Sequence, residues 1–148
     1  MSVFIHCENL VKIYKVADLE VVALQGLELS VDRGEMLALI GPSGSGKSSL
    51  MNILGGLDVP SAWQVRVDKH NLLELGEQDQ VHYRRRVVGF VWQQTARNLL
   101  PYLTIEENIE LPMAFNHVKA RERQGRIQRL LGQVELLGKE HRFPRQLS

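Results

Sequence analysis

The stretch Gly41-Pro42-Ser43-Gly44-Ser45-Gly46-Lys47-Ser48 decides the fold predicted for this chain, because it has the spacing of a phosphate-binding loop. Its glycines allow positive φ, so that successive N–H groups can turn toward an anion. Lys47 is expected on the β- and γ-phosphates, and the Ser48 hydroxyl is expected to be one ligand of Mg²⁺. The stretch therefore predicts a nucleoside triphosphate site.

The residues on either side of this loop have the character that such a site requires. Met36-Leu37-Ala38-Leu39-Ile40 is a short apolar run, typical of a strand buried on both faces. The residues from Ser49 to Leu54 continue the loop into a helix whose apolar positions face that sheet. A Gly/Ser-rich connection without a ligand is the alternative interpretation, and these flanks make it the weaker one.

The composition bounds the class of protein. The chain has 148 residues, of which 44% are hydrophobic and 24% charged, which is enough for one domain with a real core. A formal net charge of +1 gives no field that would attract nucleic acid or acidic lipid. The single cysteine, Cys7, excludes an internal disulfide. Since no apolar run approaches transmembrane length, we expect a cytosolic protein unless a partner holds it at a membrane.

The remaining pattern predicts a mixed α/β chain. Before the loop, Val3 to Tyr14 and Val21 to Val31 alternate imperfectly, as expected for a small antiparallel layer, the first with a turn at Glu8-Asn9. After the loop, strands are expected over residues 64–67 and 87–92, and helices over residues 78–86, from 104 onward and over 119–137.

Two features define the predicted helices of the second half. Thr104 and Glu107 have the spacing of a capping box, and Pro112 is expected to limit or kink the helix that they begin. The next helix carries an apolar stripe that we expect in the core, with Gly138 as its C-cap; the stripe consists of Ile127, Leu130, Leu131, Val134 and Leu137.

Gln93 and Gln94 follow the buried strand expected over residues 87–92. Open α/β sheets bind ligands at this end of their strands. From the residues alone, a ligand contact and an ordinary loop position are equally supported.

Taken together, these motifs resemble the nucleotide-binding subunit of an ABC transporter over nearly the whole chain. The resemblance implies that Tyr14 stacks on adenine, with a core tyrosine as the alternative. It also implies that Gln93 reaches the magnesium and the attacking water, although Trp92 stands where phenylalanine is commoner. The implied phosphate contacts are Gly41, Pro42, Ser43, Gly44, Ser45, Gly46, Lys47, Ser48 and Ser49, with Ser48 and Gln93 holding Mg²⁺.

The fold that this resemblance implies is an α/β P-loop NTPase fold with a parallel core sheet, a small antiparallel β layer and a helical subdomain. Residues 1–92 would form the β layer and nucleotide-binding core, and residues 93–148 the glutamine loop and helical subdomain. Trp63 and Lys69 are departures, because the family often has glycine at both positions, and a distorted turn is expected at each.

The segment from Asn98 to Pro112 is similar to the branch that serves lipoprotein-release and macrolide-export type permeases. Residues 100–107 are then the implied coupling surface for a separate membrane permease. The resemblance further implies a head-to-tail dimer with a second nucleotide-binding subunit, a position on the cytoplasmic face of the cell membrane, and no nucleic-acid partner.

The last residues, Gln146-Leu147-Ser148, resemble the start of the family's signature motif. The family's magnesium-binding aspartate, catalytic glutamate and switch histidine follow that motif, so none can be placed on this sequence. We therefore expect ATP hydrolysis driving transport for the complete protein. A hydrolysis-incompetent binding module and a soluble ABC ATPase acting on nucleic acid or ribosomes are the alternatives.

Because the phosphate-loop strand pairs in this family with a later strand, an exposed apolar sheet edge is also expected.

Overall fold

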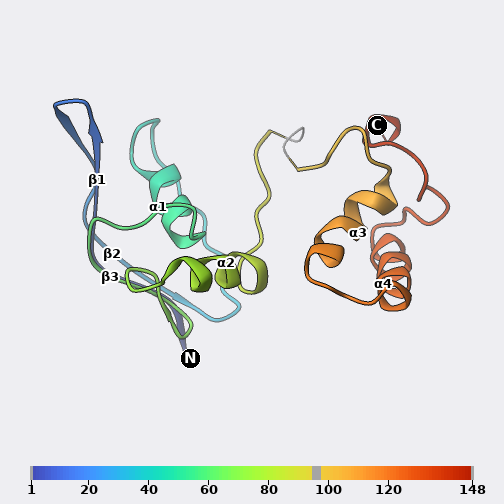
Figure 1. The fold of residues 1–148 in the computed structure, drawn as a ribbon. Coiled ribbons are helices and arrows are strands. Elements are labelled where there is room, and N and C mark those ends of the chain that lie inside the picture. Colours follow the sequence, from blue (N-terminus) through green and yellow to red (C-terminus); the bar gives the residue numbers. More distant parts are fainter. Residues whose placement is uncertain (1, 95–97, 148) are drawn as a thin grey trace. The chain divides into compact units, whose positions relative to one another are not determined.

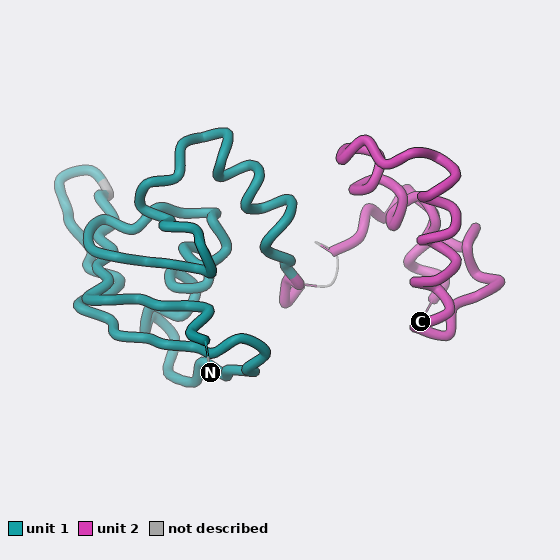
Figure 2. The backbone as a smooth tube through the Cα atoms, turned by 90° about the horizontal axis from the view of Figure 1, so that it is seen from below, with its two compact units in different colours: residues 1–90 teal, residues 91–148 magenta. Residues whose placement is uncertain are grey.

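The computed structural model describes residues 2–94 and 98–147 and divides the chain into two compact units. Residues 1–90 form the first unit and residues 91–148 the second (Figure 2). Each unit has its own cluster of buried hydrophobic side chains. In the described ranges, no helix combines the length and the apolar character needed to cross a membrane.

The first unit is built on a four-stranded antiparallel sheet (Figure 1). Strand β1 (Val3–Val16) pairs with β2 (Leu19–Asp32) on one side and with β3 (Ala62–Val67) on the other. The short β4 (His70–Asn71) pairs with β3, which gives the order β2-β1-β3-β4. The antiparallel layer predicted before the phosphate loop is confirmed.

The turn predicted at Glu8-Asn9 is wrong, because β1 runs through these residues. The pairing of β1 with β2 shifts between Cys7 and Leu10, and Asn9 adopts a φ of 49°. The Asn9 N–H donates to a carboxylate oxygen of Glu28 over 2.7 Å. A β-bulge therefore absorbs the break in the alternation, and the strand continues beyond it.

Two helices of the first unit pack with the sheet. Helix α1 (Lys47–Leu54) follows the phosphate loop as predicted, and α2 (Glu77–Arg86) lies within one residue of its expected start. Tyr83 of α2 is fully buried, and its hydroxyl donates to the Leu54 carbonyl oxygen at 2.6 Å. The shared core contains Leu50, Ile53 and Tyr83 from these helices, with Cys7, Leu10 and Val65 from the sheet.

Two strands predicted to be buried on both faces do not form. Residues 36–40 and 87–92 are not part of any β-strand, and Met36 and Val91 are 97% and 93% exposed. A strand requires a neighbour that satisfies its N–H and C=O groups. Among the described residues, neither segment joins a ladder, so their apolar character alone does not make them strands.

The two departures from the family's glycines have different outcomes. Trp63, within β3, has a φ of 71°, the left-handed region that favours glycine. In the turn between β3 and β4, the positive φ belongs to Asp68, at 53°, and not to its neighbour Lys69. The backbone therefore keeps a glycine-like conformation at Trp63, whose side chain is exposed.

The second unit contains two packed helices, α3 (Ile105–Phe115) and α4 (Ala120–Gln133) (Figure 1). The predicted capping box is confirmed, because Thr104 and Glu107 exchange both side chain to backbone hydrogen bonds. Helix α3 continues through Pro112 for three further residues. The buried residues at the contact are Ile105, Met113, Ile127 and Leu131.

Helix α4 ends earlier than its apolar stripe predicted. Glu135 has a φ of 58°, and the Leu136 N–H donates to the Leu131 carbonyl at 2.9 Å, the bond of a Schellman motif. The predicted cap, Gly138, lies in a later turn with a φ of 80°. Two members of the stripe are core, Ile127 and Leu131, while three are exposed, Leu130, Val134 and Leu137.

Candidate functional site

The phosphate loop lies directly against β2. Gly46 precedes α1 with a φ of 84°, and a Cβ added to it would lie 2.5 Å from the Ala23 carbonyl oxygen. Gly44 also has a positive φ, 82°, but a Cβ there would meet nothing within 4 Å. Gly44 is therefore needed for the turn of the loop, whereas Gly46 is needed both for its turn and for the close approach to the sheet.

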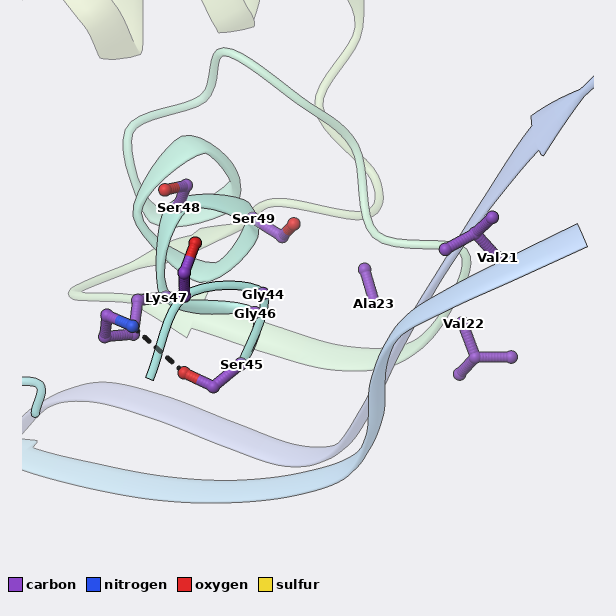
Figure 3. Close-up of a pocket in the computed structure, with 10 residues that line it drawn as sticks. Val21, Val22, Ala23, Gly44, Ser45, Gly46, Lys47, Ser48 and Ser49 are labelled. Carbon is purple, nitrogen blue, oxygen red and sulfur yellow. Dashed lines mark hydrogen bonds between the residues drawn. The ribbon is translucent and has the colours of Figure 1, made fainter. Parts of the chain in front are cut away.

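An open pocket of about 430 Å³ lies between this loop and β2 (Figure 3). Its walls come from Val21, Val22 and Ala23 of β2 and from residues 43–49. The first hydrogen bond within α1 runs from the Leu50 N–H to the Gly46 carbonyl, so the N–H groups of the first turn have no acceptor inside the helix. Those groups and the positive end of the helix dipole favour an anion in this pocket.

Lys47 is folded onto the loop. Its ammonium donates to the carbonyl oxygens of Gly41 and Pro42, at 2.8 Å and 2.6 Å, and to the Ser45 hydroxyl at 3.0 Å. An ammonium has three donors, so these contacts use all of them. Contact with a phosphate therefore requires Lys47 to exchange loop acceptors for phosphate oxygens.

Ser48 offers an exposed hydroxyl in the first turn of α1. Mg²⁺ at triphosphate sites keeps most of its ligands as phosphate oxygens and water and takes one or two from protein. A single hydroxyl beside a pocket for phosphates therefore fits the predicted magnesium ligand.

Tyr14 lies beside the same pocket. Its position on β1 is opposite Val21, one of the pocket residues. The Tyr14 hydroxyl donates to an Asp58 carboxylate oxygen at 2.7 Å, and the Ser49 hydroxyl lies within hydrogen-bonding distance at 3.3 Å. Tyr14, which is predicted to contact adenine, thus lies within hydrogen-bonding distance of the helix that follows the phosphate loop.

Two further residues of this network were missed by the sequence analysis. The Lys12 ammonium donates to Asp58 at 2.5 Å and to the Val59 carbonyl at 2.7 Å, and it lies 4.7 Å from the centre of the Tyr14 ring. Lys12 is only 8% exposed. The signal was a lysine two residues from Tyr14 in an alternating strand, where side chains share a face.

The Asp58 carboxylate is kept ionised by its neighbours. Burial raises the pKa of this group, but hydrogen bonds from Lys12, Tyr14 and the Val59 N–H, together with the Lys12 charge, lower it further than burial raises it. The pKa of Asp58 in the folded chain is therefore below its ordinary value.

Gln93 and Gln94 are exposed residues of the second unit. The phosphate loop belongs to the first unit. The predicted contact of Gln93 with a magnesium ion and a water stays a prediction.

A second hollow, of about 410 Å³, lies on α4 and is lined by Glu122, Gly125, Arg126 and Arg129. All four residues come from one face of one helix and carry mixed charge, as expected for a solvated surface. We assign the candidate site to the pocket at the phosphate loop, where two elements converge.

Comparison with known proteins agrees with this assignment. Residues 24–148 match the family described as ABC transporter. The chain is 38% identical over 147 residues to the lipoprotein-releasing system ATP-binding protein LolD of Chromohalobacter salexigens, covering 99% of this chain and 61% of LolD. It is 40% identical over 144 residues to the macrolide export ATP-binding/permease protein MacB of Marinobacter nauticus, covering 97% of this chain and 22% of MacB.

A solved structure is similar as well. The dimeric ATP-binding cassette MJ0796 of Methanocaldococcus jannaschii, bound to ADP and Pi, matches with a TM-score of 0.80 and 36% identity. The match covers 97% of this chain and 63% of the cassette. The chain therefore spans about three fifths of the length of LolD and of this cassette.

The two loop glycines give a matched pair of variants. Gly44→Ala should lower the free energy of unfolding by about 1–2 kcal/mol, the cost of a left-handed non-glycine residue. Gly46→Ala should lower it by at least about 1 kcal/mol more, because its methyl group displaces the backbone of β2. Urea denaturation of the full chain measures both values, and equal losses would contradict the close approach at Ala23.

Asp58 should make stability depend on pH. Since its folded pKa is lowered, its contribution is present above the unfolded pKa and is lost as pH falls through the folded pKa. The difference in free energy of unfolding between the wild type and Asp58→Asn should shrink as pH falls from about 5 through the ordinary pKa of an aspartate, about 3.9, toward the lower pKa of Asp58 in the folded chain. A difference that stays constant over this range, measured by urea denaturation, would show that Asp58 is not ion-paired.

Proposed function

The chain belongs to the ABC transporter family, and from this premise we propose that it binds ATP and is the ATP-binding component of a membrane transporter. The observation that carries the proposal is the pocket between the phosphate loop and β2, which combines the triphosphate motif with helix N–H groups. The related cassette MJ0796, solved with ADP and Pi, supports the same ligand class.

In the proposed complex, the phosphates lie along residues 41–49. Lys47 leaves the carbonyls of Gly41 and Pro42 for the β- and γ-phosphates, and the Ser48 hydroxyl faces Mg²⁺. Mg²⁺ neutralises charge on the phosphate oxygens when bound. Gln93 is the proposed second magnesium contact, and the Tyr14 ring is the proposed platform for adenine.

We further propose that the whole protein hydrolyses ATP. Hydrolysis requires a group that positions or deprotonates water and a second metal contact. By resemblance, the family's carboxylates for these roles follow the signature motif, and the present chain covers about three fifths of a related cassette. A second nucleotide-binding subunit, bound head-to-tail, is the proposed partner, since the related cassette is described as dimeric.

The proposed surface for a membrane permease is the loop before α3. The Asn108 side chain accepts from the Leu100 N–H at 2.7 Å and donates to the carbonyls of Leu100 and Leu103, which fixes the course of this loop. Leu99 and Tyr102 remain exposed on it, Tyr102 by 70%. An ordered loop with outward apolar side chains is suited to an interface, and it would place the protein on the cytoplasmic face of the membrane.

Lys47→Ala tests the proposed nucleotide site. It should weaken the binding of a fluorescent ATP analogue to the full chain by at least about tenfold, because a charge-assisted contact to phosphate is lost. Lys15→Ala is the matched control, since Lys15 is an exposed lysine of β1 paired only loosely with Glu20, at 3.3 Å. Equal affinities of both variants and the wild type would refute ATP binding through this loop.

Tyr102→Glu tests the proposed permease surface. It should reduce recovery of the permease subunit with the purified protein by about tenfold, because a charge replaces a large apolar contact, while ATP binding is retained. Phe115→Glu, at an exposed residue at the end of α3, is the control and should leave recovery unchanged. Normal recovery with Tyr102→Glu would place the interface elsewhere.

A further inference from the structure

A buried ammonium beside Tyr14 is the feature that the proposed function leaves unexplained. Lys12 is nearly inaccessible, yet lysine is among the residues least often buried without a partner. It is held by the Asp58 carboxylate and by the Val59 carbonyl. Burying a charge is unfavourable unless it is paired and hydrogen-bonded, so this position depends on both acceptors.

These contacts fix Tyr14 at two points. The Lys12 ammonium lies over the ring, 4.7 Å from its centre, a cation–π geometry that occupies one face. The phenol oxygen is held by Asp58 at 2.7 Å, with the Ser49 hydroxyl 3.3 Å away. Ring and hydroxyl are therefore held at once, and a base that stacks on Tyr14 has to use the face of the ring opposite Lys12.

The same contacts connect three elements of the first unit. Lys12 and Tyr14 belong to β1, Asp58 and Val59 to the loop after α1, and Ser49 to the first turn of α1. Ser49 also lines the pocket at the phosphate loop. The position of the Tyr14 ring is thus set relative to the residues proposed to hold the phosphates.

We propose that Lys12 and Asp58 are positioning residues that hold the Tyr14 ring in place for the base of ATP, so that base and phosphates bind together. The inference rests on the proposed function, because it concerns the same site. A ring that is already ordered loses little conformational entropy when a base stacks on it. Neither residue touches the nucleotide in this account, and both act through Tyr14.

The ion pair could instead serve only to join β1 to the loop after α1. The two interpretations differ in what happens to a ligand without a base. Inorganic tripolyphosphate uses the phosphate loop alone, whereas ATP uses the loop and the Tyr14 ring. A positioning role therefore changes the ratio of ATP affinity to tripolyphosphate affinity, and a purely structural role leaves this ratio unchanged.

The test is isothermal titration of the full chain with ATP and with tripolyphosphate. Lys12→Met keeps a long apolar side chain in the buried position, and it should weaken ATP binding by about fivefold while changing tripolyphosphate binding by less than about twofold. Tyr14→Phe keeps the ring but removes its hydroxyl contact, and it should also lower the ratio. Lys15→Met, at the exposed lysine of the same strand, is the matched control and should leave both affinities unchanged.

A double variant separates positioning from direct contact. In a Tyr14→Ala background, adding Lys12→Met should cause no further loss of ATP affinity, because the ring that Lys12 positions is gone. Equal losses for both ligands with Lys12→Met, no loss for either, or additive losses in the double variant would each overturn the inference.

The wild type itself separates this inference from the proposed function. Equal affinity for ATP and tripolyphosphate would overturn the role of Tyr14 and its positioning pair while leaving phosphate binding intact. Binding of neither ligand would overturn the proposed function, and the inference with it.

Discussion

The contact between Gly46 and the backbone of β2 is the constraint on which the site depends. It brings the phosphate loop against the antiparallel sheet with no room for a side chain. The pocket exists because one wall is the loop and the other is β2. The position of the loop therefore depends on the position of β2 in the sheet. The bulge at Asn9 preserves the pairing of β1 with β2, which fixes that position.

Two lysines near the pocket, Lys47 and Lys12, have different surroundings and are therefore suited to different roles. Lys47 bonds to exposed loop acceptors, which a phosphate can replace without leaving a buried group unpaired. Lys12 is buried, and removing its partner Asp58 would leave a desolvated charge. The first is suited to exchange partners on ligand binding, and the second to keep them. This difference agrees with the roles proposed for the two residues, contact with the ligand for Lys47 and support of Tyr14 for Lys12.

Features set by neighbours in sequence could be predicted, and features set by partners distant in sequence could not. The loop spacing, helix α1 and the capping box at Thr104 depend on residues a few positions apart, and all three are found. The apolar segments 36–40 and 87–92 were predicted to be strands and are not. A strand also needs a neighbouring strand to pair with, and the sequence of the segment itself does not specify that neighbour. After α4 ends, the chain turns at Glu135, a non-glycine residue with a positive φ. Because no glycine marks this turn, the sequence did not predict where the helix ends. The burial of Lys12 likewise depends on Asp58, 46 positions away.

The central claim is that the pocket recognises the terminal phosphates of a nucleotide. Isothermal titration of the wild-type chain with ATP and with AMP tests it most directly, since the two ligands share a base, a sugar and one phosphate. Because the proposed contacts of Lys47 are to the β- and γ-phosphates, ATP should bind at least about 100-fold more tightly than AMP. Equal affinity for the two ligands would contradict the account, because it would locate recognition at the base and not at the loop.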